Sequence, residues 1–489
     1  MSSLYKSTRG GISNIKSSDA LLRGIADDGG LFVKEGSFEK FDLKDFLDLN
    51  YEEIAHKILK VFFDFDEEKL KDSIHKAYKK FLNIEIAPIK ILEDRAFIEL
   101  YHGPTGAFKD IALTLLPYLM RLSMEKQSIS EEILILTATS GDTGKAALEG
   151  FKDVPKIKIM VFYPKYGVSK AQRIQMITQE GNNLNVVGIN GNFDDAQTAV
   201  KSIFIDGNIK NELKQKGIIF SSANSINIGR LFPQIVYYFY GYMNLVKNHK
   251  IELGQEVNIV VPTGNFGNIL SSYYAKKIGL PVKKFICGSN ENNILTDFIN
   301  TGIYDTRRNF YTTITPSMDI LISSNLERLI YDISGEDSKI VSTLMNDLKA
   351  SGKFEINKDK LKFFYGDYGT EEEILIAIDE MYKKNDYLID PHTAVGQVVY
   401  DKYVKKTYDN TYALITATAS PYKFARTVLK ALGFNDESED INFERKLSEK
   451  TNTKVPEFIS SLENKKIIYD NLIEKGEIKD EVLKFALDK

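Results

Sequence analysis

Short apolar runs rich in β-branched residues alternate along the chain with segments whose apolar residues recur at helical spacing. The runs predict strands at residues 133–137, 157–163, 184–189, 257–261, 282–287 and 412–417. Because helical segments separate these strands, we expect parallel sheets covered by helices, which is an α/β fold. Residues 1–90 show helical patterns at 41–47 and 51–63 but none of these strands, which indicates an N-terminal domain. The charged tail beyond about residue 435 is predicted to be mostly helical.

Lys109 follows a Gly/Pro turn (101–108) and opens a helical pattern that runs to Met120. Burial and the positive end of a helix both disfavour an ammonium ion and so lower the pKa of a lysine. A lysine with a lowered pKa can form a Schiff base at neutral pH. The alternative is an ordinary surface lysine in the first turn of an amphipathic helix.

A glycine-containing loop at 262–268 stands between the strand 257–261 and a helical pattern that includes Ile269, Leu270 and Tyr274. Glycines let the backbone approach a bound group, and the free N–H groups of a helix start suit a phosphate. This loop predicts a phosphate site through Gly264, Asn265, Phe266, Gly267 and Asn268. A single glycine loop is also compatible with an ordinary turn.

A second Gly/Ser/Thr turn follows the strand 133–137 and contains Ser140, Gly141, Asp142, Thr143 and Gly144. Its hydroxyl and N–H donors suit a carboxylate or a phosphate, although an N-capped helix would have the same pattern. Asp142 is unfavourable beside an anion unless it faces a cation or a phenol-like hydroxyl.

Together these segments resemble the longer-chain branch of the threonine synthases, which are pyridoxal-phosphate enzymes of the tryptophan-synthase-β-like fold. The resemblance extends in unbroken order from residue 5 to about 430 and rests on 7–10, 28–33, 101–110, 140–144, 172–176, 224–230, 262–268, 316–319, 323–328 and 390–396. It implies fold type II, with two lobes of parallel or mixed sheets and the cofactor between them. We expect an N-terminal domain at 1–94, a catalytic region at 95–430 with a smaller lobe at about 130–250, and a C-terminal helical extension at 431–489.

The resemblance implies a role for each matched residue. Lys109 would link covalently to pyridoxal 5′-phosphate and shuttle protons, and residues 264–268 would hold its phosphate. The loop 140–144 would bind the substrate carboxylate, with Asp142 near the ring hydroxyl of the cofactor, where related families usually have asparagine. Thr418 would face the pyridine nitrogen. Ser420 stands where relatives commonly have histidine, and His392 is the nearest candidate to replace it, although a structural place at a helix start is the favoured reading.

Asn224, Ser225 and Arg230 resemble the family's binding group for the substrate phosphate. Arginine suits this role because its planar guanidinium binds two phosphate oxygens at once. The alternative for Arg230 is a solvated helix arginine. A further cationic turn contains Lys165, Ser169 and Arg173, and it is a candidate for a second contact with the phosphate.

The reaction implied is the conversion of O-phospho-L-homoserine and water to L-threonine and phosphate. One alternative is a threonine-type dehydratase or phospho-lyase on the same scaffold. Another, of a different class, is a non-catalytic protein that binds pyridoxal phosphate or phosphate; the retention of Lys109 with every loop argues against it.

Composition narrows the remaining possibilities. A formal net charge of −4 with interspersed signs provides no basic surface for nucleic acid or membranes. One cysteine and five scattered histidines exclude an internal disulfide and leave no metal-binding pattern. No secretion signal or membrane span is evident, so we expect the protein in the cytoplasm. As a separate expectation, we take it to be a monomer or homodimer.

Overall fold

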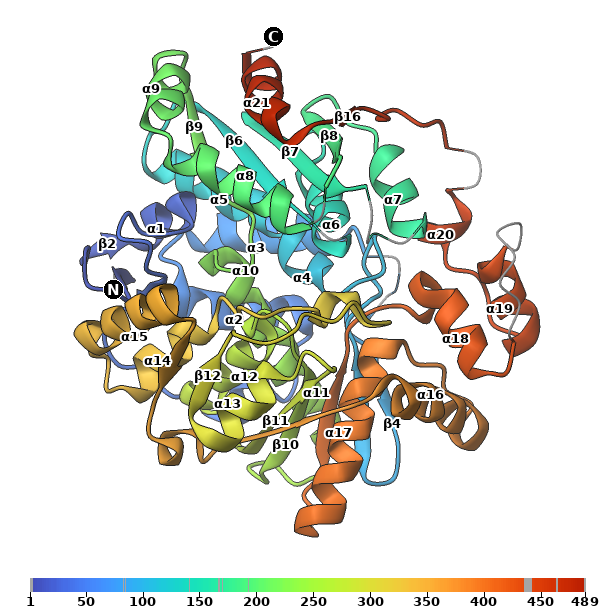
Figure 1. Ribbon diagram of the computed structural model, residues 1–489. Coiled ribbons are helices and arrows are strands. Elements are labelled where there is room, and N and C mark those ends of the chain that lie inside the picture. The colour runs from blue at the N-terminus through green and yellow to red at the C-terminus, as the bar shows by residue number, and fades with distance from the viewer. Residues whose placement is uncertain are drawn as a thin grey trace.

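The computed structural model describes residues 3–81, 83, 85–139, 141–165, 168, 170–191, 193–434, 442–462 and 465–487. Its two main sheets appear one below the other in Figure 1. The larger, lower sheet has the spatial order β14 (Phe364–Tyr368), β11 (Val282–Ser289), β10 (Val257–Pro262), β15 (Ala413–Ala417), β5 (Arg95–Glu99) and β4 (Ile89–Ile91). Its neighbours are parallel except at the edge, where β4 runs antiparallel to β5.

The smaller sheet is parallel throughout its described strands. Its spatial order is β16 (Leu472–Ile473), β8 (Leu184–Ile189), β7 (Ile157–Pro164), β6 (Glu132–Ala138) and β9 (Ile218–Ser221). The edge strand β16 comes from the C-terminal tail, so part of the tail is extended where the sequence predicted mostly helix. An edge strand of only two residues gives no periodic pattern of its own in the sequence, and it becomes a strand only by pairing with β8.

The N-terminal segment forms an antiparallel sheet of β1 (Leu4–Ser7), β2 (Ile15–Lys16) and β3 (Phe32–Lys34). Its helices are α1 (Ser17–Arg23), the 3-10 helix η1 (Leu43–Phe46), α2 (Tyr51–Phe62) and α3 (Glu67–Tyr78). Asn50 caps α2 in a capping box with Glu53, which fixes where this helix begins.

Helices connect and cover the two main sheets. Those in the first half of the chain are α4 (Lys109–Leu113), α5 (Leu116–Lys126), α6 (Asp142–Phe151), α7 (Lys170–Ile177), α8 (Phe193–Ile205), α9 (Gly207–Gln215), α10 (Ile228–Leu231) and α11 (Pro233–Lys247). The later ones are α12 (Gly267–Lys277), α13 (Ile294–Thr301), α14 (Leu326–Ile333), α15 (Ser338–Ser351), α16 (Glu371–Asn385), α17 (Pro391–Thr407), α18 (Ala425–Ala431), α19 (Phe443–Thr451), α20 (Glu457–Ser460) and α21 (Ile478–Leu487). The remaining short elements are η2 (Pro316–Met318), η3 (Lys358–Leu361), η4 (Pro421–Phe424), η5 (Lys475–Glu477) and the strand pair β12 (Ile303–Asp305) and β13 (Lys353–Glu355).

All six strands predicted from the sequence are confirmed, with ends that agree within two residues. The helical pattern after Lys109 is one segment in the sequence but two helices in the structure, α4 and α5. Pro117 explains the break, because proline lacks an N–H group and is tolerated only in the first turn of a helix. No helix that the structure describes combines the length and apolar character needed to cross a membrane.

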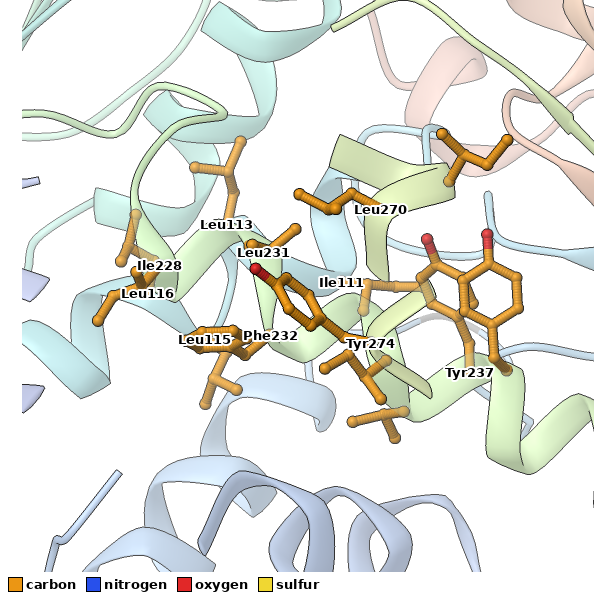
Figure 2. Close-up of a cluster of buried hydrophobic side chains, with 14 of the residues drawn as sticks. Ile111, Leu113, Leu115, Leu116, Ile228, Leu231, Phe232, Tyr237, Leu270 and Tyr274 are labelled. Carbon is orange, nitrogen blue, oxygen red and sulfur yellow. The ribbon is translucent and has the colours of Figure 1, made fainter. Parts of the chain in front are cut away.

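An apolar cluster that includes side chains of α4 joins the helices next to the predicted site loops in one core (Figure 2). It draws side chains from α4, α5, α10, α11 and α12, and includes Ile111, Leu113, Leu115, Leu116, Ile228, Leu231, Phe232, Tyr237, Leu270 and Tyr274. These side chains are at most 4% exposed. The helices that begin at Lys109, near Arg230 and at Gly267 are therefore held against one another by packing.

Candidate active site

The predicted site loops follow the ends of neighbouring parallel strands. In the larger sheet, residues 264–268 follow β10, Thr418 follows β15, and the Lys109 turn follows β5. In the smaller sheet, residues 140–144 follow β6 and residues 224–230 follow β9. Carboxyl ends of parallel strands share one edge, where open α/β sheets bind ligands. The structure thus brings together loops that are up to about 310 residues apart in the sequence.

Lys109 is the first residue of α4, and its amine contacts side chains from both main parts of the fold. Its Nζ lies 3.4 Å from Asp142 Oδ2 and 3.3 Å from Ser317 Oγ. Burial lowers the pKa of Lys109, as the sequence predicted; Asp142 opposes this shift, while Lys423 and Arg230 add to it. A larger share of the amine is therefore neutral and nucleophilic near neutral pH.

Asp142 is paired with a cation, as the sequence analysis expected for a carboxylate beside an anion site. Lys423 Nζ lies 2.6 Å from Asp142 Oδ1, and Gln172 Nε2 donates to the same oxygen at 2.8 Å. Lys423 is 3% exposed and Asp142 4% exposed. Burial alone would raise the pKa of Asp142, but Lys423 and Lys109 hold it well below its ordinary value. Asp142 is therefore an ionised carboxylate inside the protein.

In the loop before α6, some of the N–H groups that could serve a ligand are bonded within the protein. Thr139 Oγ1 accepts from the backbone N–H of Gly141 at 3.0 Å and of Gly144 at 2.9 Å. A Cβ at Gly144 would lie 2.4 Å from the Thr139 side chain, which explains that glycine by packing. Two amides are thus already bonded, while the Thr143 side chain remains partly exposed. Ser140 lies outside the described residues.

The loop 264–268 has its carbonyl groups bonded and its helix start free of a side-chain cap. Phe266, the N-cap residue of α12, has a φ of 62°. Ser323 Oγ donates to the Gly264 carbonyl at 2.8 Å, and Asn325 Nδ2 donates to the Asn265 carbonyl at 3.1 Å. With the carbonyls occupied in this way, the first amides of α12 are the donors left to an anion.

Asn268 supplies an unpaired donor in the first turn of the same helix. Its Oδ1 accepts from the hydroxyls of Tyr237 and Tyr238, both at 2.5 Å. Its Nδ2 is buried and has no hydrogen-bond partner among the described residues. Because an unpaired buried donor costs free energy, this atom is best explained by a bound acceptor.

Arg230 is buried, whereas the alternative from the sequence was a solvated helix arginine. Its side chain is 3% exposed, and its Nη1 donates to the Ala223 carbonyl at 2.7 Å. The Nε atom has no partner, and no carboxylate of the described residues forms an ion pair with Arg230. Burial lowers the pKa of Arg230 to about 10, so the guanidinium stays charged at neutral pH. A buried guanidinium of this kind suits an anionic ligand.

The other residues of the predicted phosphate group lie in the turn before α10. Asn224 and Ser225 are both partly exposed. Asn325 Nδ2 also donates to the Ser225 carbonyl at 3.2 Å, so one amide group joins this turn to the loop at 265. Arg328 Nη2 donates to the Ile226 carbonyl at 2.6 Å from the other side. The turn is therefore held in place by α14.

Thr418 lies beside the Lys109 turn through a short antiparallel pairing. The Phe108 N–H donates to the Thr418 carbonyl at 2.9 Å, and the Ser420 N–H donates to the Gly106 carbonyl at 3.0 Å. Ser420 also caps η4, the helix that carries Lys423. His392 occupies the first turn of α17, the structural place favoured by the sequence, and its Nε2 additionally accepts from the Ser317 N–H at 3.3 Å.

The cationic turn at 165–173 is less well placed than Arg230. Lys165 and Arg173 are exposed, and Ser169 lies outside the described residues. Three contributors were missed by the sequence reasoning as site residues, namely Lys423, Ser317 and Asn325. Ser317 and Asn325 lie in two of the segments that carry the resemblance, whereas Lys423 lies outside them, and only the unfavourable position of Asp142 signalled that a cation was needed there.

Comparison with known protein families first defines the class. The model "Pyridoxal-phosphate dependent enzyme" matches residues 98–416. Two further models, "Threonine synthase N terminus" and "Threonine synthase, C-terminal", match residues 4–78 and 393–478. The middle of the chain therefore has the fold type II catalytic region of pyridoxal-phosphate enzymes.

Individual relatives narrow the class to one family. A threonine synthase from Pseudomonas aeruginosa is 37% identical, over 87% of this chain and 90% of the relative. The crystal structure of pyridoxal-phosphate-bound threonine synthase from Brucella melitensis superposes with a TM-score of 0.88 at 32% identity and covers 100% of both chains. Human threonine synthase-like 1 is 42% identical over 86% of this chain, but the chain spans only 58% of that relative's length. The chain belongs to the threonine synthase family.

The residues present fit the cofactor of this family. Lys109 provides a buried amine of lowered pKa, and the start of α12 with Asn268 Nδ2 provides unpaired donors for a phosphate. Asp142 provides a carboxylate 3.4 Å from Lys109 Nζ, and Thr418 is joined to the Lys109 turn by the hydrogen bond from the Phe108 N–H. Among the residues that the structure describes, no group of His, Cys, Asp or Glu is arranged to hold a metal ion.

Proposed function

We propose that this protein converts O-phospho-L-homoserine and water to L-threonine and phosphate with pyridoxal 5′-phosphate linked to Lys109. The observation that carries the substrate assignment is Arg230, a buried guanidinium whose Nε has no partner. The cofactor phosphate has its own donors at 264–268, so Arg230 is available for a second phosphate, that of the substrate. Asn224 and Ser225 lie in the same turn and complete this group.

The substrate carboxylate is assigned to the loop before α6. The Thr143 hydroxyl and, from the sequence resemblance, Ser140 would supply the donors, while Gly141 and Gly144 shape the loop through their N–H hydrogen bonds to Thr139 Oγ1. Asp142 lies next to this loop but is neutralised by Lys423, so it does not repel a carboxylate as an unpaired acid would. Thr418 would hold the pyridine nitrogen of the cofactor through its hydroxyl, and that nitrogen would then have no carboxylate partner.

When bound, the cofactor supplies an electron sink for charge that develops on the substrate. Lys109 Nζ, once free, would carry protons in turn: it would remove one from the α-carbon and one from the β-carbon before the phosphate leaves, then give one to the γ-carbon and, after water has added, return one to the α-carbon. Arg230 holds the phosphate ester while its C–O bond breaks, and then holds the released phosphate. That phosphate is the base that accepts a proton from the water added at the β-carbon, so Arg230 serves both binding and catalysis.

The test is the product formed from phosphohomoserine by the purified protein. The proposal predicts equal amounts of phosphate and L-threonine, and no 2-oxo acid. Phosphate with a 2-oxo acid would instead indicate the phospho-lyase, and turnover of L-threonine or L-serine without any effect of phosphate would indicate the dehydratase. A colourless protein that does not bind added pyridoxal phosphate would leave only a phosphate-binding protein.

We further propose the division into 1–94, 95–430 with a smaller lobe at about 130–250, and 431–489. Support comes from the separate antiparallel sheet of the first segment and from the two main sheets of the second. We place the protein in the cytoplasm, as a monomer or homodimer without nucleic-acid or membrane partners. The support is the charge of −4 with interspersed signs and the free, buried Cys287.

A further inference from the structure

Ser317 contacts the reacting amine from a segment remote in sequence from the other site loops. It lies in η2, and its Oγ accepts from Lys109 Nζ at 3.3 Å, beside Asp142 Oδ2 at 3.4 Å from the same nitrogen. A neutral amine has two N–H groups and one lone pair. Because these two oxygens accept both N–H groups, the lone pair points away from both of them. We propose that Ser317 is a catalytic residue that, with Asp142, aims the lone pair of the free Lys109 amine at the proton it must remove.

The backbone of Ser317 is held by a buried histidine and carboxylate. The Ser317 N–H donates to His392 Nε2 at 3.3 Å, and His392 Nδ1 lies 2.9 Å from Asp390 Oδ1. Since Nε2 accepts a hydrogen bond, the ring proton is on Nδ1 and is donated to Asp390. His392 is 3% and Asp390 1% exposed. His392 and Asp390 are therefore positioning residues that act through Ser317, and they do not touch the amine.

The rest of the Ser317 loop is also fixed. Asp319 accepts from Asn290 Nδ2 at 2.7 Å, from the Thr313 hydroxyl at 2.8 Å and from the Thr313 N–H at 3.0 Å. On another side, a Cβ at Gly264 would lie 2.5 Å from the Ser317 carbonyl oxygen, so the loop packs directly on the cofactor-phosphate loop. Preorganisation of this kind reduces the reorganisation needed when a proton is transferred.

The proton transfer balances without any further reactant. The substrate C–H bond breaks, an N–H bond forms on Lys109, and the electron pair of the C–H bond stays on the substrate. Ser317 Oγ and Asp142 then accept from the ammonium, and the same nitrogen gives its proton back later. The inference rests on the proposed function only in that Lys109 is the proton carrier.

The first experiment measures exchange of the α-proton of a phosphate-free amino acid in deuterium oxide, by NMR, with the cofactor-loaded protein. Ser317→Ala should slow exchange about 10- to 100-fold, as expected for a lost hydrogen bond to a charged group, with unchanged KM and unchanged cofactor absorbance. Ser317→Thr, which keeps the hydroxyl, should restore most of the rate. Ser342→Ala is the matched control, because Ser342 is another partly buried serine, bonded to the Arg9 carbonyl, and should exchange at the wild-type rate.

A double-variant cycle tests the positioning role of His392. His392→Ala alone should slow exchange, but in the Ser317→Ala background it should cause no further loss, because it acts only through the serine. An equal loss in both backgrounds would overturn that role. An unchanged exchange rate in Ser317→Ala would overturn the proposal itself. Loss of the cofactor absorbance in this variant would also overturn it, because Ser317 would then be needed for cofactor binding.

A second readout does not depend on turnover. In cofactor-free protein, the pH dependence of Lys109 acetylation, followed by mass spectrometry, reports the pKa of the amine. Loss of the Ser317 acceptor destabilises the ammonium more than the neutral amine, so Ser317→Ala should lower that pKa; an unchanged value would contradict the contact. If the wild-type protein makes no threonine yet exchanges α-protons through Ser317, the proposed function fails and this inference stands.

Discussion

Replacing Lys423 by methionine isolates the charge pair beneath the active site. The substitution keeps the length and apolar stem of the side chain but leaves the buried Asp142 without its 2.6 Å partner. Breaking a buried ion pair costs about 3–5 kcal/mol. Because Gln172 at 2.8 Å and Lys109 at 3.4 Å remain beside Asp142, we expect the lower end, about 3 kcal/mol, in urea unfolding near pH 8.

The pH dependence gives the sign of this effect. Burial raises the pKa of Asp142, and Lys423 and Lys109 lower it below its unfolded value, so in the wild type its stabilisation is present above that value and lost as pH falls through the folded pKa. In Lys423→Met the pKa of Asp142 rises, and a protonated Asp142 needs no cation. The difference in unfolding free energy between the two proteins should therefore be largest near pH 8 and shrink toward pH 5.

The matched control is Lys423→Met combined with Asp142→Asn, which removes both charges. This double variant should recover most of the lost stability, because the neutral amide leaves no unpaired charge in the interior. A destabilisation below about 1 kcal/mol for the single variant, independent of pH, would refute the assignment of Asp142 as a buried anion. So would a double variant no more stable than the single one.

Three further predictions follow from other parts of the site. The purified protein should be yellow, and borohydride should fix the cofactor on Lys109; Lys109→Ala should bind cofactor weakly through 264–268 and lose turnover by orders of magnitude, and a colourless wild type would contradict both. Arg230→Ala should keep the cofactor spectrum but lose about 2–5 kcal/mol of transition-state stabilisation in kcat/KM for phosphohomoserine, and Arg230→Lys should restore part of it. If α-proton exchange on a phosphate-free amino acid falls by the same factor as kcat/KM, Arg230 is structural. Phe458→Ala should destabilise by about 1–2 kcal/mol and reduce cofactor affinity, and unchanged affinity would show that its contact with the Gly106 turn is passive.

Much of the fold could be predicted because its signals are local. The strands β6, β7, β8, β10, β11 and β15 are short, mostly apolar runs rich in β-branched residues, the pattern of strands buried on both faces. The helices that begin at Asp142 and Gly267 follow glycine-containing turns directly after a strand, and this pattern is visible in the sequence. The direction of the Lys109 pKa shift also followed, because it depends on burial at a helix start.

The network around these residues could not be predicted, because it is built from pairs with no sequence spacing of their own. Lys423 follows β15 and Asp142 follows β6, and the two residues meet because these strands of different sheets end in the same region of the fold. Thr139 Oγ1 accepts hydrogen bonds from the N–H groups of Gly141 and Gly144, which are then not free for a ligand. A glycine-rich sequence pattern does not reveal this competition. Ser317 depends on His392, whose place in the first turn of α17 already explained its presence in the sequence.

The C-terminal segment shows how distant parts of the chain meet at the Lys109 turn. In Figure 1 it runs from α18 and α19, beside the larger sheet, up to β16 and α21 on the smaller one. Between them α20 places the Phe458 ring where a Cβ on Gly106 would lie, 2.3 Å from the nearest ring atom, and the Phe458 carbonyl accepts from Gln175 of α7 at 3.5 Å. Only glycine permits this approach, and its φ of +73° is one that other residues rarely adopt. The turn that positions Lys109 is therefore shaped by a helix about 350 residues further along, which packs on elements of both sheets.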